Sequence, residues 1–253
     1  MLFPIQRPIL GVNVVLAALF FAVAVSGQEP PSTEDKNLGS KPQPQALTPS
    51  VSFTLDWPGS QPEHYTVLVA FDGSSDYSSQ ISTASPASSA SESASPTSDS
   101  VSEAPFETRF TITAPIRERI FSLAQQANFF NGNFNYNQHR VADTGTKTLA
   151  YTDSARHYQT SYNWSENKAV DELTHIFEGI GSTIESGYRL QHLMRFDKLG
   201  LNQELSGMEQ AAQSGQLREL QIIAPVLRQI ASNSGYMNIA RERARHLLQL
   251  ASR

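Results

Sequence analysis

Short runs of alternating apolar and polar residues follow residue 50 of the chain. In residues 51–57 the apolar side chains occupy every second position, which is the period of a strand with one buried face. The alternation returns in residues 65–71, directly before Asp72-Gly73, a dipeptide typical of tight hairpin turns in which both central residues have positive φ. We therefore expect two strands, a short return strand through Tyr77, and a further strand in residues 106–112.

Helical periods follow the strands. Apolar residues spaced three and four apart predict a helix over residues 116–130, with a hydroxyl cap and a proline in its first turn. Residues 147–152 and 157–164 predict a hairpin, and a second amphipathic helix begins at about Asn167. An antiparallel sheet covered on one face by two helices is the economical packing for this order of elements, so the predicted fold class is α+β.

After Gly187 only helical periods remain. Apolar faces recur in residues 201–212, 217–231 and 240–251, and Pro225 is expected to bend the middle helix. We expect a helical hairpin or three-helix unit over residues 188–253, following an α+β domain over residues 51–186.

Charge changes near the same point. Residues 28–187 carry 9 Lys or Arg against 19 Asp or Glu, whereas residues 188–253 carry 9 against 5. This change supports a boundary near Gly187. The net charge is −5, and the basic part lacks a dense Lys/Arg face interleaved with aromatic residues, so we do not expect the protein to bind nucleic acid.

Two segments are too polar to form a core. Residues 28–50 are rich in Pro, Gln and Ser and predict a disordered leader. Residues 81–104 consist mostly of Ser, Ala, Thr and Pro, and predict a disordered, low-complexity insertion that loops out of the α+β domain.

The chain begins with the features of a secretory signal peptide. Arg7 is the single charge before Glu29, and residues 9–25 are almost entirely apolar and are followed by small residues. We expect residues 1–27 to be removed, leaving a secreted or periplasmic protein without stable membrane insertion. An uncleaved anchor is the alternative, because 17 residues lie at the lower edge of a membrane span.

Cysteine is absent from the chain. This excludes a lipoprotein anchor, a disulfide framework and a thiol nucleophile. Stability after export must therefore come from packing alone.

Asp143-Thr144-Gly145-Thr146 resembles the Asp-Thr-Gly signature of aspartic proteases, in which two such turns bring paired carboxylates together. A second Asp-Thr-Gly does not occur, so a dimer would have to complete the site. A turn leading into the strand at Lys147 is the other interpretation of the same residues.

Glu172 and His175 lie three residues apart on the second predicted helix, a spacing that can hold one metal ion from a single helix face. A matching pair is missing from the sequence. We therefore interpret these residues as a solvated polar face, and expect neither a metal nor another cofactor.

Aromatic residues gather on the second hairpin. Tyr151, Tyr158, Tyr162 and Trp164 offer rings that would stack on a sugar or a peptide. The same four residues would otherwise form part of the core beneath the helices. They are the predicted binding residues.

The runs VADTGTKTLAY at residues 141–151, FEGIGSTIE at residues 177–185 and IAPVLRQIA near the end are similar to secreted bacterial domains of unassigned function. The resemblance covers about residues 106–250. It implies a bacterial exported protein and carries over no catalytic residue.

The function predicted from the sequence is a non-enzymatic binding or interaction module, acting on an unknown protein, peptide or glycan in the cell envelope. Two alternatives stay open. One is a secreted hydrolase that uses Asp143 as its catalytic carboxylate, and the other is a proteinaceous inhibitor of an extracytoplasmic enzyme.

Overall fold

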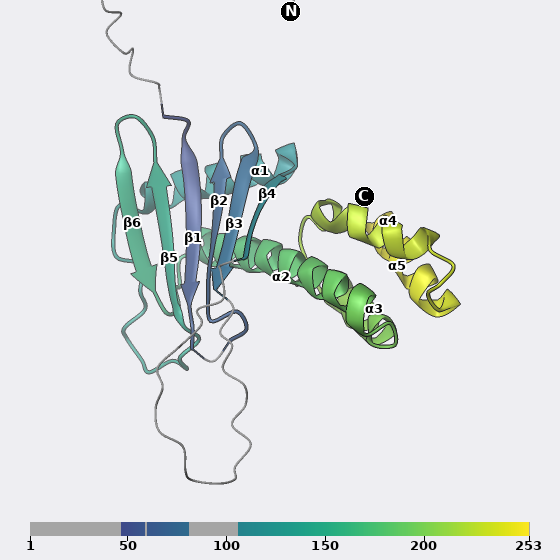
Figure 1. The fold of residues 1–253 in the computed structure, drawn as a ribbon. Helices are drawn as coiled ribbons and strands as arrows, with labels where there is room; N and C mark the ends of the chain where they lie inside the picture. Colours follow the sequence, from purple (N-terminus) through teal and green to yellow (C-terminus); the bar gives the residue numbers. More distant parts are fainter. Residues whose placement is uncertain (1–46, 59, 81–105, 253) are drawn as a thin grey trace, which may run out of the picture. The chain divides into compact units, whose positions relative to one another are not determined.

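The computed structural model describes residues 47–58, 60–80 and 106–252 (Figure 1), all within the unit Gln45–Arg253. The predicted signal peptide, most of the predicted leader and the Ser-rich insertion lie outside the described residues. The strands are β1 (Ser50–Asp56), β2 (His64–Ala70), β3 (Ser74–Gln80), β4 (Phe106–Thr111), β5 (Thr146–Thr152) and β6 (His157–Tyr162). The helices are α1 (Ala114–Gln126), α2 (Lys168–Phe196), α3 (Gly200–Gln213), α4 (Ala224–Ser232) and α5 (Asn238–Leu250), with short 3₁₀ turns η1 (Asn128–Phe130) and η2 (Leu220–Ile223).

The six strands form one antiparallel sheet in the order β4-β3-β2-β1-β5-β6. The predicted α+β class is confirmed, and so is the order of strands and helices along the chain. Strands β1 to β4 form a meander, in which each strand pairs with the next along the chain. Strands β5 and β6 form a separate hairpin, and β5 pairs with the edge of β1 that β2 leaves free.

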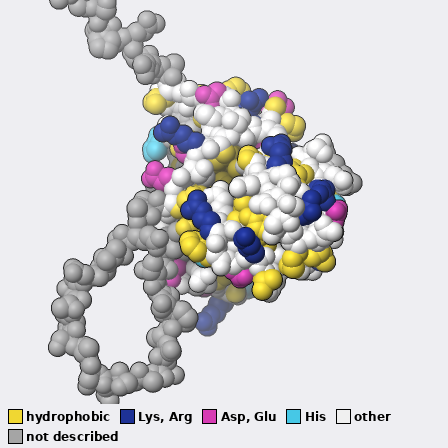
Figure 2. All heavy atoms as spheres, turned by 45° about the vertical axis from the view of Figure 1, so that its right-hand side comes forward, with side chains coloured by type: hydrophobic (Ala, Val, Ile, Leu, Met, Phe, Trp, Pro, Cys, Tyr) yellow, Lys and Arg dark blue, Asp and Glu magenta, His cyan; other side chains and the backbone are white. Residues whose placement is uncertain are grey.

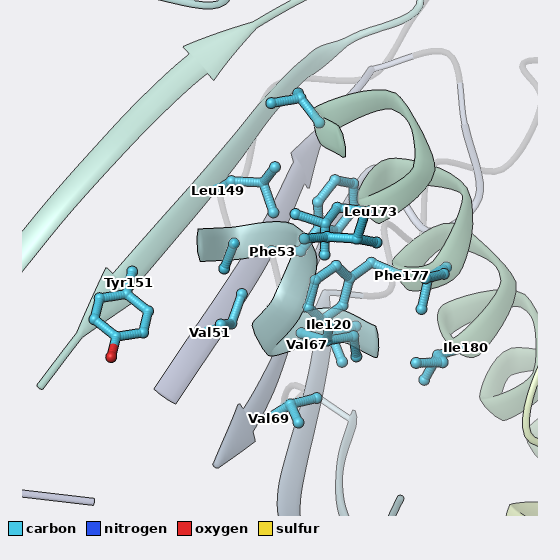
Figure 3. Packing of buried hydrophobic residues seen from close by; sticks show 14 of the residues in the cluster. Val51, Phe53, Val67, Val69, Ile120, Leu149, Tyr151, Leu173, Phe177 and Ile180 are labelled. Carbon is cyan, nitrogen blue, oxygen red and sulfur yellow. The ribbon is translucent and has the colours of Figure 1, made fainter. Parts of the chain in front are cut away.

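The register of the sheet places three rows of side chains on its inner face, which α1 and α2 cover. The middle row carries Phe53 and Val67, and the row beside it carries Val51 and Val69. Phe53 stacks on Phe177 of α2 with ring centroids 5.5 Å apart and an interplanar angle of 3°. Figure 3 shows the side chains of both helices converging on these strand residues. Burial of large apolar groups between the two layers is therefore the main source of stability.

Helix α2 is longer than the sequence pattern suggested. It runs without a break through residues 186–188, where a domain boundary was expected, and ends at Phe196. Its first part packs on the sheet, whereas Leu190 and Met194 belong to a second apolar cluster with α3, α4 and α5. The change of charge balance near Gly187 thus coincides with a change of packing partners along a single helix.

The middle C-terminal helix differs from the expectation. Pro225 does not bend it but lies in the first turn of α4, and the residues before it form η2. A proline is favoured in the first turn, where its missing N–H is not needed and its fixed φ suits the helix. The prediction of one bent helix over residues 217–231 was therefore wrong.

The first hairpin is present, but its turn is of another kind. The N–H of Gly73 donates to the carbonyl oxygen of Ala70 at 2.9 Å, and Gly73 alone has a positive φ, of 94°. Phe71 and Asp72 are consequently the central residues of the turn, and Gly73 follows in the left-handed region. This is the longer hairpin loop that ends in a bulge, so the predicted two-residue turn was wrong.

Two polar contacts join the C-terminal helices to the sheet layer. Glu219 accepts hydrogen bonds from the backbone N–H and the hydroxyl of Thr113, each at 2.7 Å, at the start of α1. The hydroxyl of Thr183 on α2 donates to the carbonyl oxygen of Arg218 at 2.7 Å. The side chain of Thr113, the N-cap residue of α1, forms no capping hydrogen bond to the helix. The carboxylate of Glu219 therefore provides the negative charge and the acceptors at the N-terminus of α1.

The surface over the C-terminal helices is mixed. Figure 2 shows Lys and Arg side chains spread among hydrophobic and uncharged groups on this face, without a single basic patch. Among the described residues, no helix has both the length and the apolar character needed to cross a bilayer.

Gly187 provides a test of the shared helix. A Cβ at this position would lie 2.4 Å from a methyl carbon of buried Ile223, so Gly187→Ala should lower the free energy of unfolding by about 1 to 3 kcal/mol through overpacking. Gly207→Ala is the matched control, because nothing lies within 4 Å of its added Cβ. This control should raise the free energy by up to about 1 kcal/mol through helix propensity. Urea denaturation measures both, and equal effects would contradict the packing of α2 against η2.

Candidate functional site

A cavity of about 650 Å³ lies between one flank of α2 and one end of the sheet. Strand ends and helix turns contribute together to its wall. The lining residues that carry the argument are Trp57, Tyr65, Tyr77, Lys147, Tyr162, Trp164, Asp171, Glu178, Gly181, Ser182, Glu185 and Arg189.

The sheet contributes its last inner row to this cavity. The register of the paired strands β3, β2, β1, β5 and β6 places one residue of each strand in this row, and these residues are Ser79, Tyr65, Leu55, Lys147 and Tyr162. Residues two apart on a strand share a face, so these side chains point to the same side as the apolar core rows. The core therefore ends in a row with hydroxyl and amino groups, beneath the flank of α2.

Lys147 is the buried cation of this row. The residue is only 6% exposed. Its Nζ donates to the carbonyl oxygen and the hydroxyl of Thr144, both at 2.9 Å, and to the carbonyl oxygen of Asn163 at 3.1 Å. Burial lowers the pKa of Lys147, while the nearby carboxylates of Glu178 and Asp143 act in the opposite direction. All three hydrogens of an ammonium group are thus engaged, and they fasten two loops together.

Helix α2 presents a row of carboxyl groups to the cavity. Asp171, Glu178 and Glu185 follow one another at seven-residue intervals, which brings them to one flank of a helix. Burial raises the pKa of Glu178, an effect that Lys147 and His175 only partly oppose. Among the described residues the Glu178 carboxyl group forms no hydrogen bond, and burial and neighbouring charges alone shift its pKa.

Glu185 is held in place by the sheet. Its Oε1 accepts hydrogen bonds from the hydroxyl of Tyr77 and, at 2.9 Å, from that of Ser79. Burial raises the pKa of Tyr77, and the adjacent Glu185 raises it further. Both side chains on β3 therefore remain proton donors and orient the carboxylate.

Tyr65 lies near the carboxyl groups of Glu178 and Glu185. It is 7% exposed, and burial, followed by the charges of Glu178 and Glu185, raises its pKa. An added Cβ at Gly181 would lie 2.9 Å from the Tyr65 ring, so the glycine allows the ring to approach α2. Among the described residues the hydroxyl group has no hydrogen-bond partner, although it borders the cavity.

Both tryptophans of the chain border the cavity. Trp57 follows the end of β1 and is half-buried, and Trp164 follows β6 and is 41% exposed. The ring of Trp164 meets that of Tyr136 edge to face, with centroids 4.8 Å apart. Both indole rings thus form part of the cavity lining.

The four predicted binding residues do not form one surface. Tyr162 and Trp164 border the cavity, and the hydroxyls of Tyr162 and Thr174 are hydrogen-bonded at 2.6 Å. Tyr151 and Tyr158 pair at the other end of the hairpin. Tyr151 is 5% exposed and packs on Phe129, so it offers no ring face to a ligand, whereas Tyr158 is half-buried.

The Asp143-Thr144-Gly145 segment is a turn in this structure. Oδ1 of Asp143 accepts a hydrogen bond from the N–H of Gly145 at 3.0 Å, and Gly145 has a φ of 84°. The N–H of Thr144 donates to Oδ1 of Asn163 at 2.9 Å. Asp143 therefore supports the loop that Lys147 also holds, and it is Thr144 rather than Asp143 that borders the cavity.

Glu172 and His175 point to different partners. Glu172 forms a two-pronged ion pair with Arg119 of α1, which lowers the pKa of the carboxyl group. Nδ1 of His175 donates to the carbonyl oxygen of Asp171 at 2.8 Å, and the side chain borders the cavity. Glu172 therefore serves to join two helices.

Comparison with known proteins adds no family to this description. No protein-family model matches the chain, and no curated protein matches it significantly.

The sequence contained two signals for the residues that were missed. Lys147 precedes Leu149 and Tyr151 by two and four positions in a predicted strand, so strand periodicity placed it on the inner face. The spacing of Asp171, Glu178 and Glu185 also placed them on one helix flank. Sequence periodicity did not reveal that this flank faces the Lys147 end of the sheet, because the angle between helix and sheet is a tertiary property.

Glu178 generates a prediction about pH. Because burial raises its pKa above that of the unfolded chain, the folded state binds more protons, and the stability contributed by this group falls as pH rises through the folded pKa. Glu178→Gln retains the shape of the protonated group, so it should raise the free energy of unfolding at neutral pH. This gain in the free energy of unfolding should disappear at a pH well below the range in which carboxyl groups titrate. Urea denaturation over a pH series measures this difference, and a variant that is less stable than the original at neutral pH would refute it.

Proposed function

We propose that this protein is an exported, non-enzymatic binding module that takes a small polar ligand into the cavity between α2 and the sheet. The observation that carries the proposal is the last inward-facing row of the sheet, in which Tyr65, Lys147 and Tyr162 border the cavity. The cavity volume lies within the range of sites that enclose small ligands.

The stability of the fold alone does not account for this row. Burial of a phenol hydroxyl or a carboxyl group without a partner costs free energy, and apolar side chains at the same positions would extend the core. Tyr65 and Glu178 bear part of this cost: burial raises the pKa of each, although Glu178 is only half-buried and both residues border the cavity. Local departures of this kind from good packing are typical of functional sites.

The state of the lining groups favours binding over turnover. A lysine nucleophile needs a free lone pair on its amine, whereas the three donors of Lys147 are directed at three oxygen atoms. Asp143 does not line the cavity, and its Oδ1 accepts a hydrogen bond within its own turn. Lys147 and the two loops that it joins shape the cavity and hold it rigid, as a preorganised binding site requires.

Export is the part of the proposal that rests on the sequence. The apolar run in residues 9–25 supports a signal peptide, and the proposed ligand is accordingly a molecule met outside the cytoplasm. A free small molecule, or one residue of a peptide or glycan, has the size that the cavity accepts.

The two tryptophans make the proposal testable. Because both border the cavity, a ligand that enters should change the intrinsic fluorescence of the protein. We expect at least one compound in a panel of sugars, amino acids, dipeptides and aliphatic amines to give a saturable change. Ser182→Phe should weaken this binding at least tenfold, because Ser182 is exposed on α2 and borders the cavity.

Gln191→Phe is the control for Ser182→Phe. It places the same ring at an exposed position of the same helix, away from the cavity lining, and should leave the titration unchanged. If no compound alters the fluorescence, or if both variants bind as the original protein does, the cavity is not the binding site and the proposal fails.

A further inference from the structure

We infer that the ligand of this cavity is a linear organic cation of the polyamine class, held along the carboxyl row of α2. The inference rests on the proposed function, since it names the chemistry of a ligand for the same cavity. It follows from three features of the lining: the spacing of its carboxyl groups, the use of its own cations, and the unpartnered hydroxyl of Tyr65.

The carboxyl groups are spaced for an extended ligand. Asp171, Glu178 and Glu185 are separated by seven residues each, and a helix rises about 1.5 Å per residue, so neighbouring members lie about 10 Å apart along α2. This spacing suits a flexible chain that carries amino groups at intervals. A compact ligand would reach one member of the row, whereas an extended triamine reaches two neighbouring members.

The cations of the lining neutralise this row only in part: Lys147 and His175 lower the pKa of Glu178 without cancelling the effect of burial, and Nδ1 of His175 lies 3.7 Å from Oδ1 of Asp171. Lys147 donates its hydrogens to oxygen atoms of Thr144 and Asn163 rather than to a carboxylate. Arg189 forms an ion pair with Glu204 of α3 at 3.0 Å and donates to the hydroxyl of Ser186. The carboxylates therefore leave a surplus of negative charge in a partly enclosed space, where a ligand cation is attracted most strongly.

Tyr65 is independent evidence for a ligand that donates hydrogen bonds. Its side chain is more than nine-tenths buried, borders the cavity, and has no partner among the described residues. Its oxygen atom lies near Glu178 and Glu185 in the lining, where it can accept from an ammonium or a secondary amine. Trp57 and Trp164 also border the cavity, and aromatic rings offer favourable contacts to a cation and to its alkyl chain.

Other ligand classes fit these groups less well. An anion would face the carboxyl row and be repelled, and a neutral sugar would leave the surplus charge uncompensated. A cation with several amino groups satisfies both the charge and the hydrogen-bond acceptors.

The experiment is a titration of the purified protein with spermidine, followed by tryptophan fluorescence. We expect a saturable change with spermidine, and at least tenfold weaker binding of fully N-acetylated spermidine, which keeps the chain but lacks the charge. A linear dicarboxylic acid of similar length should not bind. Ser182→Phe should weaken spermidine binding at least tenfold, whereas Gln191→Phe should leave it unchanged.

A variant that removes one charge tests whether the carboxyl row of α2 binds spermidine. Glu178→Gln should weaken spermidine binding at least fivefold while leaving the protein folded and no less stable at neutral pH, so that lost binding is separated from lost structure. Glu118→Gln is the control, because it removes one exposed carboxylate from α1, outside the cavity lining, and should bind spermidine as the original protein does.

Failure of this inference is distinct from failure of the proposed function. If spermidine has no effect while a sugar, amino acid or dipeptide binds and is blocked by Ser182→Phe, the polyamine inference is wrong and the binding module stands. If spermidine binds the original protein, Glu178→Gln and Ser182→Phe equally well, it binds elsewhere and the inference is also wrong. If neither spermidine nor any compound of the panel binds, both are overturned.

Discussion

Strand β1 pairs in register with β2 on one side and β5 on the other, and this pairing determines which side chains face the helices. Because side chains alternate along every strand, the alignment of Phe53 with Val67 and Leu149 places all three on the inner face. The same alignment brings Tyr65 and Lys147 together beside Leu55. A slip of one residue in either pair would turn that whole strand over, so the register that forms the core also forms the cavity wall.

Helix α2 uses three parts of its surface for three purposes. Its apolar stripe packs on the sheet through Phe177, and its later turns supply Leu190 to the second cluster of the C-terminal helices. Its remaining flank holds Asp171, Glu178 and Glu185, which line the cavity at the end of the sheet. Because one continuous helix serves both clusters, the C-terminal helices are anchored to the element that lines the cavity. Contacts such as Thr183 with Arg218 reinforce that link.

The cavity lining combines groups that stabilise the fold with groups that do not. Lys147 belongs to the first kind, because its three hydrogen bonds close the loops around Thr144 and Asn163. Glu178 and Tyr65 belong to the second, since burial raises the pKa of each, and for Glu178 the nearby Lys147 and His175 offset this only in part. Protein stability is a small difference between large terms, so groups of the second kind are tolerated only where the rest of the core offsets them. That contrast is the physical basis for placing the ligand next to Glu178 rather than next to Lys147.

The sequence by itself determined the fold class and the order of most strands and helices, because these follow from periods of two and of about 3.6 residues that are local to the chain. It also placed Tyr162 and Trp164 on one hairpin, and the alternation around Lys147 indicated its inward position. Only the tertiary structure decided that Tyr151 is buried away from the cavity and that Glu178 faces the end of the sheet. Those outcomes depend on strand order and on the angle at which α2 crosses the strands, and both are set by packing between segments far apart in the chain, which local periodicity does not encode.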